Sequence, residues 1–81
     1  MSTLSNEPKN IIGPRLKIAR LKSKPKITQA DLLARLEVRG IILEKTSISK
    51  IEAQTRPVTD MELVAISNSL GVSILWLLGK E

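Results

Sequence analysis

The sequence contains no cysteine and no histidine. Without thiolates or imidazoles the chain has no disulfide framework and no typical zinc site, and Cys–His and Ser–His nucleophile pairs are excluded. Phe and Tyr are also absent, and Trp76 is the one aromatic residue. No apolar run is long enough to span a bilayer and no signal-peptide pattern opens the chain. We therefore expect a cytoplasmic protein that needs no cofactor and does not enter a membrane.

The 81 residues suffice for one small domain. Hydrophobic residues make up 42% of the chain, and nearly all of them are Leu, Ile, Val and Ala. An aliphatic core of this kind suits short helices packed together. Because so short a chain buries only a modest core, a partner subunit is a reasonable expectation.

Positive charge is concentrated in the first part of the chain, although the net charge is only +5. Residues 1–56 carry 12 Lys or Arg against 5 acids, whereas residues 57–81 carry one against three. Seven cations and no acid lie between Lys9 and Lys26. Such a segment is either a solvated helix face or a surface that binds a polyanion, and charge alone does not separate the two.

Turn and capping residues divide the chain into a flexible N-terminal arm over residues 1–10 and a helical domain over residues 11–81. Asn10 is a candidate cap for a first helix that ends near Ser23, ahead of Pro25. Thr28, with Asp31 three residues later, forms a capping-box pattern before the helix "QADLLARLEV".

Three further helices are expected after the loop "IILEK". The third covers about residues 45–54, the fourth begins after Thr59 and is closed by Gly71, and the fifth is the segment "ILWLL" capped by Ser73. With no strand signal and no repeat, the chain is predicted to be an all-α domain of five short helices.

The third helix has two different sides when it is placed on a helical wheel. Ile48 and Ile51 fall on the inner side, while Thr46, Ser49, Lys50 and Ala53 fall on the opposite side. A narrow helix surface rich in hydrogen-bond donors fits the major groove of DNA, which is about 12 Å wide. An ordinary surface helix would show the same residue types, so this helix alone does not decide the function.

Four segments in order resemble the phage-repressor type of helix-turn-helix protein, the Cro and lambda-repressor family, also called XRE. They are "TQADLLARL", "TSISKIE", "RPVTDMELVAI" and "LGVSILWLLG". The resemblance covers about residues 11–79. It implies a compact five-helix lambda-repressor-like domain that binds double-stranded DNA through the helix around residues 45–54.

The resemblance also implies roles for individual residues. The positions that match base-reading residues of the family are Lys45, Thr46, Ser47, Ser49 and Lys50. The positions expected to contact phosphate are Lys26, Thr28, Gln29 and Arg56. Arg20 and Glu52 match a pair that joins the first helix to the third, which implies a structural salt bridge rather than a DNA contact.

The sequence departs from the family pattern between the second and third helices. About five more residues than usual separate Leu36 from Ile48, so we expect the second helix to be longer by a turn. Glu44 takes the position that usually caps the recognition helix, where its carboxylate would favour the helix terminus but repel phosphate.

The last predicted helix is apolar nearly all round. Ile74, Leu75, Trp76 and Leu78 therefore either form a two-fold dimer contact, as in many family members, or close the core of the domain. A second apolar stripe on the first helix consists of Ile11, Ile18 and Leu21, and it faces either the second helix or a partner.

The favoured interpretation is a transcription regulator, most simply a repressor, that acts as a homodimer at least on DNA and has no small-molecule effector. The alternative is a protein-binding module, such as an antitoxin-like or anti-repressor partner. Binding of the basic first helix to a membrane surface is a weaker option. We do not expect an enzyme, because the acids are scattered singly and suggest no acid–base pair.

Overall fold

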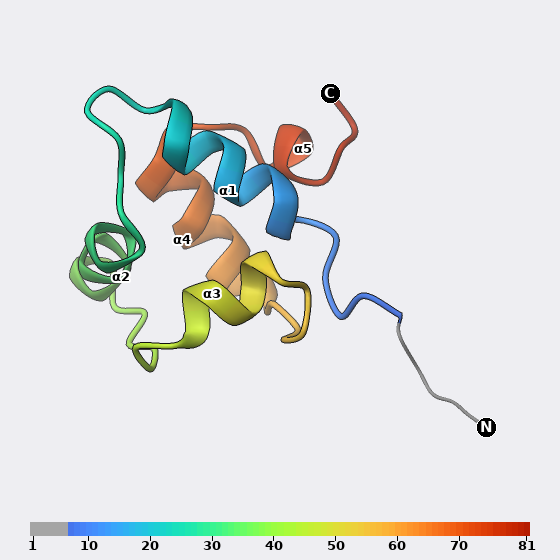
Figure 1. The fold of residues 1–81 in the computed structure, drawn as a ribbon, viewed down its shortest axis with the longest axis horizontal. Coiled ribbons are helices and arrows are strands. Elements are labelled where there is room, and N and C mark those ends of the chain that lie inside the picture. The colour runs from blue at the N-terminus through green and yellow to red at the C-terminus, as the bar shows by residue number, and fades with distance from the viewer. Residues whose placement is uncertain (1–6) are drawn as a thin grey trace.

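The computed structural model describes residues 7–81, which contain five α-helices and no strand (Figure 1). The helices are α1 (Gly13–Lys22), α2 (Gln29–Val38), α3 (Ser47–Glu52), α4 (Asp60–Leu70) and α5 (Ile74–Leu77). Helix α2 packs against α4, and α1 packs against both α3 and α5. The prediction of an all-α domain with five short helices is confirmed for the described residues.

Local capping signals place the starts of three helices where the sequence predicts them. Thr28 and Asp31 form a complete capping box at α2, and Thr59 forms one with Glu62 at α4. The Ser73 hydroxyl accepts the Trp76 N–H at α5. Each such cap is worth about 1 kcal/mol because it satisfies an amide that would otherwise lack a partner.

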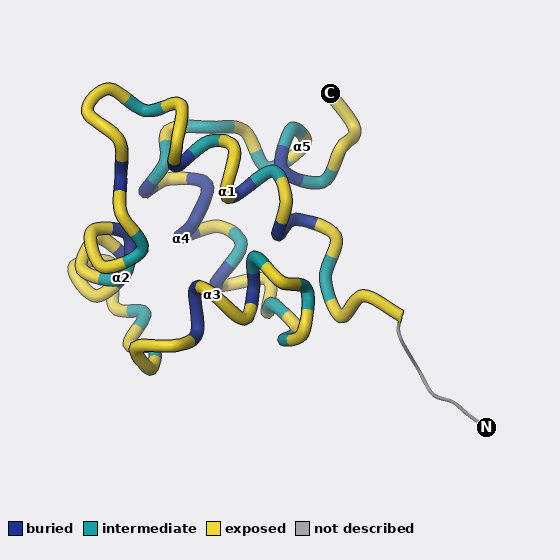
Figure 2. Tube along the Cα trace, viewed as in Figure 1, coloured by how far each residue is buried: buried dark blue, intermediate teal, exposed yellow. Residues whose placement is uncertain are grey.

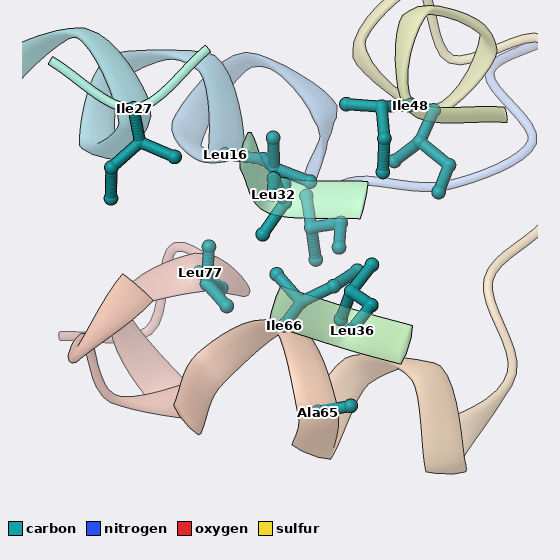
Figure 3. Packing of buried hydrophobic residues seen from close by; sticks show 10 residues of the cluster. Leu16, Ile27, Leu32, Leu36, Ile48, Ala65, Ile66 and Leu77 are labelled. Carbon is teal, nitrogen blue, oxygen red and sulfur yellow. The ribbon is translucent and has the colours of Figure 1, made fainter. Parts of the chain in front are cut away.

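The core is aliphatic, as the composition predicts, and it lies where all five helices converge (Figures 2 and 3). Its buried members are Ile12, Leu16, Ile27, Leu32, Leu36, Ile48, Ile51, Ala65, Ile66 and Leu77. In Figure 3 the labelled side chains of α1, α2, α4 and α5 point toward one another. Both isoleucines of α3 are completely buried, so this helix is fastened to the core through one side.

The start of the domain differs from the prediction. Helix α1 begins at Gly13, although the Asn10 side-chain oxygen still accepts the Gly13 N–H. Asn10 also donates to the carbonyl oxygens of Ile51 and Arg56, and the Lys9 N–H donates to the carbonyl oxygen of Gln54. Residues 1–6 of the predicted arm lie outside the described residues, whereas Lys9 and Asn10 are part of the folded domain.

The extra residues between α2 and α3 lie in the connection and not in a longer helix. Helix α2 ends at Val38, and residues 39–46 lead to α3. The predicted third helix is also too long at both ends, because α3 spans only Ser47–Glu52. Thr46, not Glu44, directly precedes it without a side-chain cap, and Gln54 with φ 63° ends the helical run.

Gly13 lies directly against the C-terminal end of α3. A Cβ atom at this position would stand 2.9 Å from the carbonyl oxygen of Glu52 and still closer to that of Ile51. Atoms of this kind do not approach so closely in folded proteins, so α1 reaches α3 only because residue 13 has no side chain.

We therefore expect Gly13→Ala to lower the free energy of unfolding by about 2–3 kcal/mol, since the backbone must move to admit a methyl group. Gly40→Ala is the matched control, because Gly40 has φ 83° but no atom near its Cβ position. It should cost only about 1 kcal/mol of backbone strain. Urea unfolding followed by circular dichroism measures both, and equal midpoints for the two variants would contradict the close approach.

Candidate nucleic-acid interface

One side of α3 is exposed, and we call it the outer face; it comprises Thr46, Ser49, Lys50 and Ala53. These residues lie opposite Ile48 and Ile51, as the helical wheel predicts. In Figure 1, α3 runs along the lower edge of the domain, and no other helix covers it from below. The Ser49 hydroxyl donates to the carbonyl oxygen of Thr46. Lys45 is exposed as well and precedes the helix.

Ser47 does not belong to the outer face, contrary to its predicted role in base reading. It is 7% exposed, because it lies one turn before Ile51 and therefore turns toward the body of the domain. A short helix divides into an inner and an outer side only approximately, and Ser47 falls at the border between them.

The predicted pair of Arg20 and Glu52 is present and buried. Arg20 Nε donates to Glu52 Oε2 at 2.7 Å and Arg20 Nη2 donates to Glu52 Oε1 at 3.1 Å. A third donor of Arg20, Nη1, reaches the carbonyl oxygen of Ile27 at 3.0 Å. The pair therefore joins α1, the loop before α2 and α3.

Gln29 lies at the start of α2 and faces the same pair. Its Nε2 donates to Glu52 Oε1 at 3.0 Å, which brings the N-terminus of α2 next to the C-terminal half of α3. Thr28 is exposed, with its hydroxyl engaged as the α2 cap, and Lys26 is exposed just before it. The phosphate roles of these three residues stay predictions, and for Gln29 one amide hydrogen is already used.

Arg56 is not the free cation that the sequence predicts. Its Nη1 and Nη2 donate to Glu62 Oε1 and Oε2, both at 2.9 Å, and Nη1 also donates to the carbonyl oxygen of Pro57. The hydrogen bonds from Arg56 hold the pKa of Glu62 below its ordinary value of 4.5, and the same bonds raise the pKa of Arg56. Sequence reasoning missed this pair, although the position of Glu62 in the capping box was a signal that its carboxylate lies near residues 56–59.

Arginines and lysines are used differently throughout residues 7–81. All five arginines donate to protein acceptors; beyond Arg20 and Arg56, the bonds are Arg15 to Trp76, Arg35 to Ser69 and Arg39 to Arg35, each at a carbonyl oxygen. None of the eight lysine side chains forms a hydrogen bond or ion pair within these residues. Only Arg20 and Arg56 bond to carboxylates, so Arg15, Arg35 and Arg39 keep their positive charge, but the cations with every donor free to meet a polyanion are the lysines.

The residues predicted for a dimer contact are only partly exposed on the surface of the domain. Ile74, Trp76 and Leu78 are half-buried, and the Arg15 guanidinium lies 5.0 Å from the centre of the Trp76 ring. Leu75 is 54% exposed, and Ile18 and Leu21 on α1 and Ile11 just before this helix are also exposed. The sequence analysis missed further exposed apolar side chains, which are Val38 at the end of α2, Ile42 in the connection, and Met61 and Val64 on α4.

Among the described residues, no cluster of three or more possible metal ligands is present, and none of the helices has the length and apolar character of a membrane span. Comparisons of the chain with protein-family models, with curated proteins and with solved structures returned no match.

The Glu62 carboxylate makes stability depend on acid pH. Because its pKa is lower in the folded protein, its contribution is fully present above pH 4.5 and is lost as the pH falls through the folded-state pKa. Glu62→Gln should lower the free energy of unfolding by about 2 kcal/mol at pH 7, since hydrogen bonds to a charged group are removed. The difference from the wild type should shrink toward pH 2.

Urea unfolding at pH values from 7 to 2 tests this expectation. Glu37→Gln is the matched control, because the Glu37 side chain is exposed and bonds to no other described residue. A constant difference between wild type and Glu62→Gln across the whole pH range would show that the Arg56–Glu62 pair does not carry the effect.

Proposed function

We propose that this chain is a helix-turn-helix transcription regulator of the phage-repressor (Cro, lambda-repressor or XRE) type that binds double-stranded DNA in the cytoplasm. In this proposal α2 and α3 form the two-helix motif and α3 enters the major groove. The observation that carries it is the outer face of α3, which is fixed to the core by Ile48 and Ile51 yet covered by no other element.

The chemistry of the outer face supports contact with base edges. Thr46 and Ser49 are small and hydroxyl-bearing, while Lys45 and Lys50 provide long cationic donors. Lysine donates to O6 and N7 of guanine, and hydroxyls donate or accept at any base pair. Ala53 leaves the surface flat at the end of the helix, so a groove wall can approach closely.

The free lysines support an electrostatic contribution to binding. Lys24 and Lys26 precede the N-terminus of α2, which the contact between Gln29 and Glu52 brings next to α3. Each phosphate neutralised by a protein cation makes log K fall with log[salt] by about 0.9. A homodimer would place two copies of α3 on half-sites about one helical turn apart, and binding across a promoter would most simply repress it.

A protein-binding module is the second candidate function. It is favoured by the exposed apolar side chains at α1 and α5 and by those at the end of α2, in the connection and on α4. A partner protein that covers either group would be compatible with DNA binding by α3 or would replace it.

Ala53→Glu should weaken DNA binding strongly without unfolding the protein. The new carboxylate would stand on the exposed outer face of α3 and meet DNA phosphates, so we expect at least a tenfold loss of affinity. Ala34→Glu is the matched control, because it adds the same charge at an exposed position of α2. Fluorescence anisotropy with duplexes selected from a random pool at two salt concentrations gives both affinities.

Three outcomes of that measurement are informative. Equal losses for the two variants would contradict docking through α3. A wild-type protein that selects no sequence and binds no duplex at low salt would overturn the proposal. Copurification with a second chain in that case would favour the protein-binding function.

Leu75→Glu should prevent dimer formation on DNA if α5 provides the two-fold contact, because a charge would be buried between the subunits. Met61→Glu is the matched control, since Met61 is also exposed, at 71% against 54% for Leu75, but lies on α4. Sedimentation equilibrium with and without duplex DNA should show a 2:1 complex for the wild type and Met61→Glu and a 1:1 complex for Leu75→Glu. Loss of the 2:1 complex only in Met61→Glu would place the contact on α4.

A further inference from the structure

A small cleft opens on one flank of α3, between this helix and the connection from α2. It is lined by Ile42, Leu43, Glu44, Ser47, Lys50 and Arg56, and we call it the connection cleft. The opposite flank of α3 is closed by Glu52 and its partners Arg20 and Gln29. The two flanks of the same short helix therefore differ in whether their polar groups are already paired.

Ser47 has a polar group without a partner in this cleft. More than nine-tenths of the residue is buried, yet its hydroxyl forms no hydrogen bond with any residue of the described range 7–81. Ser67 and Ser69 are buried to a similar degree, but only Ser47 lines the cleft. Among the described residues the one fully buried side-chain oxygen without a partner is Ser69 Oγ, so the Ser47 oxygen is not sealed from solvent and its hydroxyl is free to meet a ligand in the cleft.

Lys50 and Arg56 add cationic donors to the same cleft. The Lys50 ammonium is unpaired among the described residues. Arg56 spends both hydrogens of Nη1 and one of Nη2 on Pro57 and Glu62, which leaves the Nε hydrogen and one Nη2 hydrogen of its five donors. Ser47, Lys50 and Arg56 thus offer a hydroxyl, an ammonium and a guanidinium edge.

We propose that the connection cleft binds a phosphate group through Ser47, Lys50 and Arg56. Phosphate oxygens accept hydrogen bonds and carry the negative charge that these donors favour. The proposal rests on the proposed function in taking the phosphate from the DNA backbone, and a free phosphate has the same chemistry. It moves Lys50 and Ser47 from base reading to backbone contact and leaves Lys45, Thr46 and Ser49 for the bases.

Glu44 lines the same cleft and opposes an anion there. Replacing Glu44 should therefore change phosphate affinity in the direction opposite to replacing Ser47 or Lys50. Glu44→Gln should tighten phosphate binding about threefold to tenfold, whereas Ser47→Ala and Lys50→Gln should each weaken it to a similar degree.

The first experiment uses inorganic phosphate and methyl phosphate alone. The full chain is titrated with each at constant ionic strength, with chloride as the reference, and the backbone amide signals are followed by NMR. Saturable shifts at Ser47 and Lys50 that vanish in Ser47→Ala are expected. Shifts that instead spread evenly over the exposed lysines would overturn a built site.

The second experiment uses a selected duplex in which one phosphodiester at a time is replaced by an uncharged methylphosphonate. One linkage per half-site should weaken the wild type about tenfold, and the same replacement should weaken Lys50→Gln and Ser47→Ala less than twofold. Ser49→Ala and Lys80→Gln are the controls, since Ser49 lies on the outer face and Lys80 follows α5, and both should keep the full effect.

The two experiments separate the failure of the cleft from the failure of the proposed function. Phosphate shifts at Ser47 without any duplex binding support the cleft as a site for free phosphate and remove its DNA role. If one methylphosphonate replacement loses its effect in the Ser47 and Lys50 variants, but free phosphate causes no NMR shifts, the cleft binds only the DNA backbone. If the protein binds the duplex but neither the NMR shifts nor the linkage-specific effect is seen, the phosphate site in the cleft is overturned. In that case α3 remains a groove-binding helix.

Discussion

The position of α3 depends on the buried ion pair between Arg20 and Glu52. A helix of six residues is about 9 Å long and is not stable by itself, so contacts with other elements must fix it. The two charges bond to each other twice, and the remaining bonds to Ile27 and Gln29 bring in the loop before α2 and the first residue of α2. Loss of one partner of such a pair costs about 3–5 kcal/mol, because the other charge stays buried.

The ion pair also has a consequence for charge. Since every arginine donates to a protein acceptor, the cations whose donors are all free are lysines, and lysine is a strongly hydrated point charge on a flexible stem. Lysine binds phosphate well but lacks the planar fork with which arginine binds guanine at two atoms. The sequence selectivity of the proposed complex would therefore rest on the short outer face, and most of its affinity on salt-dependent backbone contacts.

Local signals in the sequence predict much of this fold. Thr28, Thr59, Ser73 and Gly71 mark helix ends through bonds within a few residues, and the structure agrees with them. Long-range contacts are harder to predict from the sequence. The Arg20–Glu52 pair followed only from the family resemblance. Nothing local indicates that Asn10 bonds to the end of α3, and the capping position of Glu62 places its carboxylate near residues 56–59 without identifying Arg56 as its partner. The burial of Ser47 was missed because six residues define the inner side of a helix only to within one position.

The unequal flanks of α3 follow from the length of the connection. The flank beside α2 is closed because Gln29 donates to Glu52, while the ion pair with Arg20 neutralises this carboxylate. On the other flank, residues 42–44 of the connection form a wall at a distance from Arg56 and leave the donors between them unpaired. In the proposed complex the duplex would have phosphates along both walls of its groove, and the open flank would offer the donors of Ser47, Lys50 and Arg56 to one of them. The connection, at which the sequence departs from the family that it resembles, would thus set which way α3 leans in the proposed complex.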